Sequence, residues 1–489
     1  MDKQNYISDL ITNEDINNWS SNKLIFIEAP TGKGKSHFIK HTLSNHNTTK
    51  KILILVNRTI IKKQSEIEIG NNKNIVIKTY QLLSELIVTK SPKIADFIGF
   101  DYIICDESHH FCEESEFIFN TDVSFNWVMN QNAIKIFMTA TGKYIKGYIL
   151  DELELNIEHY YIENKYDFIE KLYFYENDKT IGKLLIDLPK DEKAIYFTSA
   201  KKAHKMNEIL KSCVFYCSNN NYNYRQYVDP DKITYIEENE KFEEQVLCCT
   251  KVADCGFNLK DDKIKHIIVD IADLSSIIQC IGRKRIVFGD KIILYIKDKK
   301  GNAISRKLEN FQEKIKYANI ILKKGDIALI EEYSHKNTYG NLIYDVVNRE
   351  KLRIEKKVNP LMHYTYNQNI MLYEEILLDK EDGFKNKLLE RMGIGDMVYT
   401  YLEQELDALI LEDILDKLIS VKMFKDEQKK FKEMLLKELL NTPKGKSRAV
   451  GLKTINSLLE ENKLEYIINS KREKLGEFRD QTYWIISKL

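Results

Sequence analysis

The sequence predicts an α/β protein with two tandem parallel-sheet domains, followed by a mostly helical region with a small α+β module at its end. Between residues 24 and 140, short continuous apolar runs alternate with longer helical stretches, which is typical of strands buried on both faces of a parallel sheet. A glycine-rich loop follows the first run, and a second alternating region extends from about residue 167 to 298. From residue 300 onward the pattern becomes helical and charged.

The length of the chain, 489 residues, is too great for a single core and suggests about three domains. The pattern along the chain refines this estimate. We expect four parts, which are residues 1–165 (first α/β domain), 166–299 (second α/β domain), 300–440 (helical accessory region) and 441–489 (small α+β module).

Composition limits the classes of protein that are possible. Lys and Arg together number 74, as do Asp and Glu, so the net charge of 0 gives no sign of a polyanionic partner, and any nucleic-acid surface must be a local patch. No run of about 18 apolar residues and no leader is present, so we expect a soluble cytoplasmic protein. The eight cysteines lack paired Cys-x-x-Cys spacing and often lie in apolar runs, which indicates reduced core thiols rather than a metal centre.

The apolar runs of the first domain are the expected strands of its sheet. In parallel sheets, ligands bind beyond the carboxyl ends of the strands, so the residues that follow each run should lie close together. The expected strands are residues 24–27, 52–56, 75–77, 102–105 and 134–138.

The loop after the first run has the composition of a phosphate-binding loop. Glycines permit backbone conformations that side chains block, so main-chain N–H groups can converge on a phosphate at the start of a helix. Lys35 is then expected to reach the β- and γ-phosphates of a nucleotide, and the Ser36 hydroxyl to hold Mg²⁺. The loop reads Ala29-Pro30-Thr31-Gly32-Lys33-Gly34-Lys35-Ser36, with Thr31, Gly32, Lys33 and Gly34 as further phosphate contacts and Ala29 where the first glycine of the pattern is expected. Taken by itself, the stretch also fits an ordinary glycine turn.

An acidic pair follows the fourth run. Asp106 and Glu107 stand at the predicted strand end, opposite the phosphate loop. A carboxylate in that place can bind Mg²⁺, and its neighbour can orient and deprotonate the attacking water, so we assign the metal to Asp106 and the water to Glu107. His109 either senses the γ-phosphate or packs, and His110 is expected to be structural.

Polar side chains at other strand ends can contact the phosphodiester backbone of a nucleic acid. Asn57 and Arg58 follow the second run, and Thr79 and Tyr80 follow the third. The hydroxyls of Thr139-Ala140-Thr141, after the fifth run, can hydrogen-bond neighbouring carboxylates. The alternative for the residues after the second and third runs is that they are ordinary solvated loop residues.

Together these stretches resemble the first motor domain of superfamily-two helicases of the DEAD/DEAH-box type. The resemblance is carried, in order, by Ala29 to Ser36, Asn57-Arg58-Thr59, Asp106 to His109 and Thr139 to Thr141. It implies two RecA-like motor domains, ATP and Mg²⁺ as cofactors, and nucleic acid as partner. No glutamine signature precedes the loop, only Asn17-Asn18-Trp19 and a distant Gln4, so the selectivity for adenine is left open.

The second alternating region supplies the expected partner domain. Hydrolysis between two domains needs a cation from across the cleft to neutralise the γ-phosphoryl transition state, and Arg283 and Arg285 are the candidates. The stretches 250–258 and 279–285 resemble the fifth and sixth motifs of the family, although Cys280 replaces the first arginine of the sixth. The resemblance implies that Gln279, a catalytic residue, contacts the nucleotide or its bound water, that Gly256 contacts the nucleotide, and that Ser199 and Thr250 contact nucleic acid. The expected strands are 194–197, 246–249, 267–269 and 292–296.

The last third of the chain is helical before a break. A leucine-rich stripe from Leu402 to Leu418 is expected to pack in a core, and the basic stretch 421–448 either follows a phosphate backbone or is a solvated helix face. We interpret residues 441–447 as a linker. The final module should contain a helix at 452–461, strands at 465–468 and 482–486, the basic residues Lys471, Arg472, Lys474 and Arg479, and the aromatic residues Tyr483 and Trp484.

The sequence therefore favours an ATP-dependent helicase or translocase that moves along or unwinds nucleic acid. DNA is the preferred substrate, because features of strict RNA helicases are absent, and an RNA helicase is the alternative. A nucleotide-gated clamp on nucleic acid or protein is the alternative from another class. The presence of both Glu107 and Arg283 disfavours a pure clamp, which needs neither.

Overall fold

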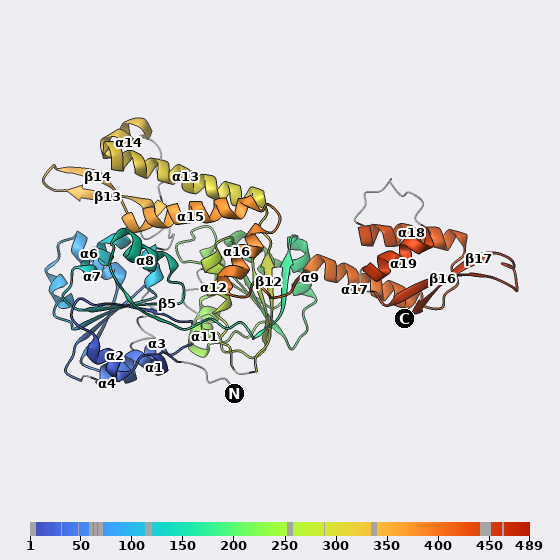
Figure 1. The fold of residues 1–489 in the computed structure, drawn as a ribbon, viewed down its shortest axis with the longest axis horizontal. Helices are drawn as coiled ribbons and strands as arrows, with labels where there is room; N and C mark the ends of the chain where they lie inside the picture. Colours follow the sequence, from blue (N-terminus) through green and yellow to red (C-terminus); the bar gives the residue numbers. More distant parts are fainter. Residues whose placement is uncertain are drawn as a thin grey trace. The chain divides into compact units, whose positions relative to one another are not determined.

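The computed structural model describes most of the chain (Figure 1). The described residues are 6–30, 32–46, 48–57, 62, 66, 72–112, 120–251, 258–287, 289–333, 340–440, 451–461 and 464–489. Thr31, Arg58 and Gly256 of the predicted site lie outside these ranges, as does the predicted linker. The chain divides into two compact units, Met1–Lys171 with Leu185–Met397, and Leu172–Leu184 with Val398–Leu489.

The first sheet confirms the predicted parallel arrangement. Its strand order is β3-β2-β4-β5-β1-β6, and the neighbouring strands pair in parallel. The strands are β1 (Leu24–Glu28), β2 (Ile52–Val56), β3 (Ile75–Thr79), β4 (Tyr102–Asp106), β5 (Ile134–Thr139) and β6 (Glu158–Tyr161). Sequence reasoning misses β6, because this edge strand alternates half-buried and exposed residues and so has no continuous apolar run.

Helices cover both faces of this sheet (Figure 1). Alternate residues of β1 point to opposite layers: Ile25 and Ile27 pack with the helices of residues 7–46, and Leu24 and Phe26 pack with those of residues 80–149. The helices of the first layer are α1 (Ile7–Leu10), α2 (Asn13–Asn18), α3 (Lys35–His37), η1 (Phe38–Leu43) and α4 (Ser44–His46). Those of the second are α6 (Tyr80–Val88), η2 (Pro92–Phe97), η3 (Ser108–Cys112), α7 (Thr121–Met129), α8 (Lys143–Gly147) and η4 (Tyr148–Glu152).

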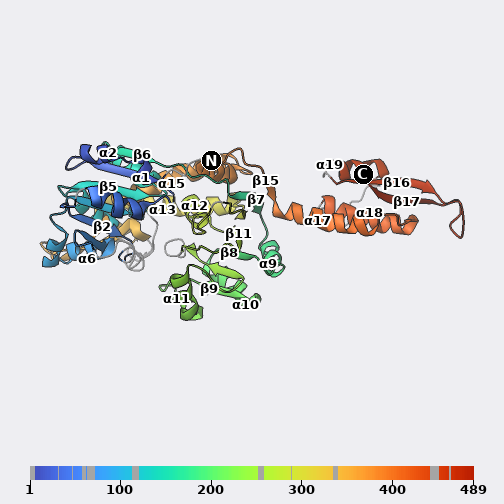
Figure 2. The ribbon, with the colours of Figure 1, turned by 90° about the horizontal axis from the view of Figure 1, so that it is seen from below.

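The second sheet is also parallel, as predicted. Within the first unit its strand order is β12-β11-β8-β10-β9. Helix α10 packs against β9 and β10, and α12 packs against β11 (Figure 2). The elements are β8 (Lys193–Phe197), α10 (Ala200–Ile209), β9 (Cys213–Tyr216), η5 (Arg225–Tyr227), α11 (Pro230–Asn239), β10 (Val246–Cys249), β11 (Ile264–Val269), α12 (Leu274–Ile281) and β12 (Ile292–Lys297).

The rest of the first unit is helical with one added hairpin. Helices α13 and α15 pack against each other, and the antiparallel strands β13 and β14 form the hairpin. The elements are α13 (Gly301–Lys324), α14 (Asp326–Tyr333), η7 (Gly340–Leu342), β13 (Ile343–Asn348), β14 (Arg353–Val358), α15 (Pro360–Leu378) and α16 (Gly383–Met392).

The second unit contains the predicted helix and strand pair of the C-terminal end. Its helices α17 and α18 share one hydrophobic core with α19, β16 and β17, to which Leu411 and Leu415 contribute from α17 and Trp484 and Ile486 from β17. The predicted stripe on α17 is only partly right, because Leu402 is buried but Leu409 is 54% exposed, and Leu411 and Leu415 fill the core instead. The elements are β7 (Ile169–Tyr175), α9 (Asp178–Ile186), β15 (Tyr399–Tyr401), α17 (Leu402–Lys417), α18 (Lys425–Leu440), α19 (Leu452–Glu461), β16 (Tyr466–Arg472) and β17 (Thr482–Lys488), where β7 begins and α9 ends in the first unit.

Two further findings bear on the sequence expectations. Within the described part of the chain, the cysteines are free thiols and most of them are buried. None of the helices in that part combines the length and the apolar character that crossing a bilayer requires.

Candidate active site

The loop after β1 has the backbone that its glycines permit. Gly32 and Gly34 have φ values of +84° and +81°, a left-handed conformation that residues with side chains rarely adopt. Gly34 caps the helical stretch that begins at Lys35, and its carbonyl accepts a hydrogen bond from the Phe38 N–H at 2.8 Å. Ser36 is exposed on the first turn of this stretch. The loop therefore turns sharply and places Lys35 and Ser36 at its exit.

Lys35 meets the acidic pair at the end of β4. Its Nζ lies 3.1 Å from Glu107 Oε1, and their side chains are only 12% and 21% exposed. The other carboxylate oxygen, Oε2, lies 3.4 Å from His109 Nδ1, which is 2.8 Å from Thr139 Oγ1. The three predicted stretches at the ends of β1, β4 and β5 thus meet through a chain of polar contacts.

The backbone at the acidic pair is unusual. Glu107 has a φ of +48°, which is costly for a residue with a side chain, and its N–H donates to Asp106 Oδ1 at 3.0 Å. The Asp106 carbonyl accepts a hydrogen bond from the Tyr80 hydroxyl at 2.9 Å. The first bond orients the Asp106 carboxylate, and the second holds the peptide that joins the two residues.

The two carboxyl groups have opposite pKa shifts. Burial raises the pKa of Asp106, and the neighbouring charge of Glu107 raises it further. Burial also acts to raise the pKa of Glu107, but the positive charges of Lys35, His109 and Arg283 outweigh it and lower that pKa. Glu107 is therefore held as a carboxylate, and a cation beside Asp106 would relieve the cost of its charge.

The domain of the second sheet reaches this site through α12. Gln279 Nε2 donates to Thr141 Oγ1 at 3.1 Å, and Thr141 N–H in turn donates to Thr139 Oγ1 at 3.0 Å. Gln279 is 8% exposed, so this contact is largely shielded from water.

The tripeptide Arg283-Lys284-Arg285 after α12 places its arginines toward the first domain and its lysine within its own domain. Arg283 lines the same cavity as Glu107, and its positive charge lowers the pKa of that residue. Arg285 Nη1 lies 3.7 Å from the position that a Cβ on Gly32 would take. Lys284 is 3% exposed and pairs with Asp290 at 2.5 Å, so it serves the structure of its own domain. Both predicted arginines therefore face the first domain, Arg283 at the acidic pair and Arg285 at the loop.

A cavity of about 970 Å³ lies between these groups. Its lining comes from both domains: Pro30, Gly32, Lys33, Glu107 and Ala140 from the first, and Gln279, Gly282, Arg283 and Arg285 from the second. A nucleotide-sized ligand fits such a volume.

The donor set fits a magnesium nucleotide. A hydroxyl and a carboxylate are suitable Mg²⁺ ligands, and lysine and arginine are suitable partners for phosphate. The Arg283 Nε atom is buried and has no hydrogen-bond partner among the described residues. A phosphate oxygen would satisfy that donor.

The residues predicted to contact nucleic acid are dispersed along the strand ends of both sheets. Asn57 follows β2 and is 4% exposed, and Thr250 follows β10, where its N–H donates to the Tyr216 carbonyl at 3.1 Å. The hydroxyls of Thr79 and Ser199 cap α6 and α10.

The placement of Tyr80 argues against its predicted phosphate contact. Its side chain is 1% exposed, stacked on His110 and bonded to the Asp106 carbonyl. Tyr80 is therefore buried and holds the backbone of the acidic pair instead of facing solvent. His110 is structural, as expected.

Sequence reasoning missed two contributors to the site. Ile7 N–H donates to the Lys33 carbonyl at 3.1 Å, and Asp9 and Leu10 line the cavity, so α1 braces the loop from outside. The buried Asp270, directly after β11, pairs with Lys202 at 2.6 Å and accepts from Thr198 Oγ1 at 3.3 Å, contacts that lie within the second domain. The position of Asp270 directly after the apolar run that forms β11 could have identified it from the sequence.

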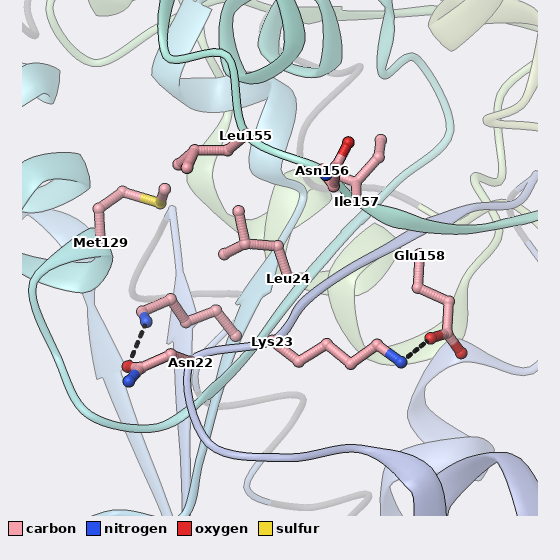
Figure 3. A pocket seen from close by; sticks show the side chains of 9 residues that line it. Asn22, Lys23, Leu24, Met129, Leu155, Asn156, Ile157 and Glu158 are labelled. Atoms are coloured by element: carbon pink, nitrogen blue, oxygen red, sulfur yellow. Dashed lines mark hydrogen bonds and ion pairs between the residues drawn. The ribbon is translucent and has the colours of Figure 1, made fainter.

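A second cavity of about 590 Å³ lies at the opposite, amino-terminal end of the first sheet (Figure 3). Leu24, Met129, Leu155 and Ile157 form its apolar lining, and Lys23 pairs with Glu158 at its rim. Its lining contains neither a glycine loop nor an acidic pair, so it is no candidate for the nucleotide.

Comparisons with known proteins concern the fold. No protein-family model and no curated protein matches the chain. Among solved structures, S. cerevisiae Dbp5 bound to RNA and ADP BeF3 is similar at 15% identity with a TM-score of 0.43, over 60% of this chain and 83% of that one. The DEAD-box helicase Mss116 bound to ssRNA and UDP-BeF is similar at 16% identity with a TM-score of 0.43, over 78% and 90%. At these identities and TM-scores, the similarity identifies neither an activity nor a substrate.

Proposed function

We propose that this chain is an ATP-dependent nucleic-acid translocase or helicase that hydrolyses ATP in the cavity between its two sheets. The observation that carries the proposal is that Arg283 and Arg285 of the second domain line the same cavity as Gly32, Lys33 and Glu107 of the first. Phosphoryl transfer requires little covalent chemistry from a protein, but it requires cations placed around the transferred group. A glycine loop on one wall and two arginines on the other supply that arrangement.

Each side chain of the loop has a separate task in this proposal. Lys35 binds the β- and γ-phosphates, the main chain from Gly32 to Gly34 surrounds them, and Ser36 with Asp106 holds Mg²⁺. The magnesium ion, when bound, supplies neutralisation of charge between the phosphates. Thr31 and Gly256, outside the described residues, stay predicted nucleotide contacts, and Gln279 is proposed to reach the nucleotide from its place beside Thr141.

Glu107 is the proposed base that orients and deprotonates the attacking water. Its lowered pKa keeps it an acceptor at neutral pH. Lys35 holds one of its oxygens at 3.1 Å, and a phosphate bound by Lys35 competes for the same ammonium. We propose that this competition frees the carboxylate oxygen for water when ATP binds, while His109 keeps hold of the other oxygen. Arg283, beside Glu107, then neutralises the transferred group.

The nucleic acid is proposed to cross the carboxyl ends of both sheets. Asn57 and Thr79 stand at such ends on the first sheet, and Ser199 and Thr250 on the second, while Arg58, outside the described residues, stays a predicted contact. The preference for DNA that the sequence suggested has no support in the site, and the similar structures named above are bound to RNA. We therefore propose single-stranded nucleic acid as the substrate class, with RNA and DNA compared directly.

The test is ATP hydrolysis measured in parallel with single-stranded RNA, single-stranded DNA and duplex DNA. Lys35→Ala should lower turnover about 100-fold or more, the typical cost of losing one preorganised transition-state contact. Glu107→Gln should bind ATP but hydrolyse it at a rate reduced to a similar degree. Lys93→Ala, at an exposed lysine of the same domain, is the matched control and should leave turnover unchanged.

Two results would count against the proposal. Full turnover in Lys35→Ala would remove the loop from the active site, and an unchanged rate in Glu107→Gln would remove that residue from its role. Strand displacement on a tailed duplex separates a helicase from a clamp, because a clamp retains the nucleic acid without separating its strands.

A further inference from the structure

The helices of residues 301–392 contact both motor domains. We call α13, α15 and α16 the brace. On the first domain, the side chain of Leu361 at the start of α15 is fully buried among the helices over the sheet. Nearby, Asn359 Nδ2 donates to Thr121 Oγ1 at 3.0 Å, and the Tyr364 hydroxyl donates to Asp151 Oδ2 at 2.5 Å. Helix α15 is therefore anchored to the first domain by apolar and polar contacts.

The brace also binds the second domain. Helix α13 follows β12 directly, and α16 packs against α12. Lys385 of α16 lies with its Nζ 3.8 Å from Asp298 Oδ2, just beyond β12, and these side chains are only 3% and 1% exposed. The same ammonium pairs with Asp382 at the cap of its own helix at 2.6 Å, so Lys385 links the start of α16 to the end of β12.

One residue of the brace lies between the two domains. The Arg391 guanidinium lies over the ring of Tyr144, in α8 of the first domain, at 5.4 Å from the centroid. The Tyr144 hydroxyl donates to Asn369 Oδ1 of α15 at 2.7 Å. Tyr144 is three residues beyond Thr141, which accepts the hydrogen bond from Gln279. Arg391 thus acts on the segment of the first domain that meets α12.

Helix α16, which carries Arg391, packs against α12 of the second domain. Asp273 caps α12 by accepting from Ser276 N–H at 2.8 Å. Burial acts to raise the pKa of Asp273, but the charge of Lys307, then the hydrogen bonds from Ser276 and last the charge of Arg391 lower it. Helix α12 carries Gln279 and leads into Arg283, so its position sets where both residues lie.

We propose that Arg391 is a positioning residue that holds α8 of the first domain and α12 of the second together, so that Arg283 stays beside Glu107 without nucleic acid. Only the expected effect on kcat rests on the proposed function. The role of Arg391 itself can be tested without ATP, by measuring the distance between the two domains. In this protein the brace, and not the nucleic acid, would hold the cleft closed. Nucleic acid would then stimulate hydrolysis only a little.

The primary test is the distance between dyes placed by click chemistry at position 93 of the first domain and position 208 of the second, both exposed. The wild-type protein should give one narrow distance distribution that single-stranded RNA does not change. Arg391→Met, which keeps the stem but removes the charge, should broaden and lengthen it. Arg391→Lys should restore most of the wild-type distribution, and Arg306→Met, at an exposed arginine of α13, should have no effect.

The kinetic test uses the same variants. Arg391→Met should lower kcat without nucleic acid about tenfold, as expected if the competent closed state falls to about a tenth of the population, and saturating nucleic acid should restore most of it. Because bound nucleic acid also stabilises a weakened fold, thermal unfolding of each variant separates this effect from a loss of fold stability. If Arg391→Met does not fold, Arg391→Gln, which keeps a polar group, takes its place.

The outcomes separate the two proposals. An unchanged distance distribution in a folded Arg391 variant overturns the role of the brace, whatever the rate of hydrolysis. Absence of hydrolysis in the wild-type protein overturns the proposed function, and the distance measurement still decides the role of Arg391.

Discussion

At the scale of single residues, the acidic pair depends on support from a buried tyrosine. Glu107 occupies a left-handed backbone conformation at φ +48°, so the peptide between it and Asp106 must be held in place by its neighbours. The Tyr80 hydroxyl holds the Asp106 carbonyl at 2.9 Å, and the ring stacks on His110. Removing the hydroxyl would take away this hydrogen bond and leave the stacked ring in place.

Tyr80→Phe should lower kcat for ATP about three- to tenfold, because a net hydrogen bond contributes about 1 kcal/mol to the orientation of the carboxylates. The affinity for nucleic acid should not change, since the ring is buried. Turnover titrated against single-stranded RNA and DNA measures both quantities. Tyr222→Phe, at a tyrosine that is 73% exposed, is the control. A large loss of nucleic-acid affinity in Tyr80→Phe would instead support the contact between Tyr80 and a nucleic-acid phosphate that the sequence suggested.

The sequence anticipated which residues meet, but not how each hydroxyl is used. Glu107 and Arg283 come from distant stretches and line one cavity, and Lys35, from a third stretch, pairs with Glu107, as expected if ligands gather at strand ends. Ser199 and Thr79 also stand at strand ends, yet their hydroxyls cap the helices that follow. A serine or threonine between a strand and a helix suits both roles, and only the hydrogen bonds distinguish them.

At the scale of elements, the phosphate loop depends on backbone shape more than on side chains. The helical stretch from Lys35 to His46 can follow β1 so closely because Gly34 adopts φ +81°. A Cβ at this position would also approach the Tyr6 ring at 3.5 Å, an ordinary contact. The cost of a side chain there is therefore mainly conformational.

Gly34→Ala should destabilise the protein by about 1 kcal/mol, the cost of placing an L-residue in the left-handed region. It should also weaken nucleotide binding, because the turn that surrounds the phosphates would relax. Thermal unfolding and binding of a fluorescent ATP analogue measure the two effects.

The matched control is Gly301→Ala at the first residue of α13, where a Cβ meets nothing within 4 Å and φ is not positive. This change should be neutral or slightly stabilising. Equal losses of stability in both variants would contradict the conformational explanation for the loop.

At the scale of the whole molecule, the parallel sheets were predictable and the brace was not. Continuous apolar runs such as Ile52–Val56 identify strands that are buried on both faces, whatever their partners. The contacts of Arg391 and Lys385 join segments that are distant in the sequence, and nothing in a charged helical pattern distinguishes them from solvated surface residues. The hairpin β13–β14 was missed for a similar reason, because Arg353–Val358 is mostly polar.

The net charge of the molecule bears on how it would bind nucleic acid. With 74 basic and 74 acidic residues, the whole molecule offers no overall attraction to a polyanion, so affinity must depend on local groups of cations. In the second unit, Lys471 and Lys474 are both exposed at the end of the β16–β17 hairpin. Each phosphate contact to a single strand contributes about 0.7 to the slope of log affinity against log salt concentration.

If this hairpin contacts the backbone, Lys471→Gln with Lys474→Gln should weaken binding to single-stranded RNA and DNA alike and reduce the salt slope by about 1.4. The control pair Lys93→Gln with Lys380→Gln removes the same charge from exposed positions of the first unit, and should leave the slope unchanged. Binding is measured by fluorescence anisotropy over a series of salt concentrations. Equal changes of slope in both pairs would show that net charge governs binding, whereas no change in the hairpin pair would exclude the hairpin from the nucleic-acid path.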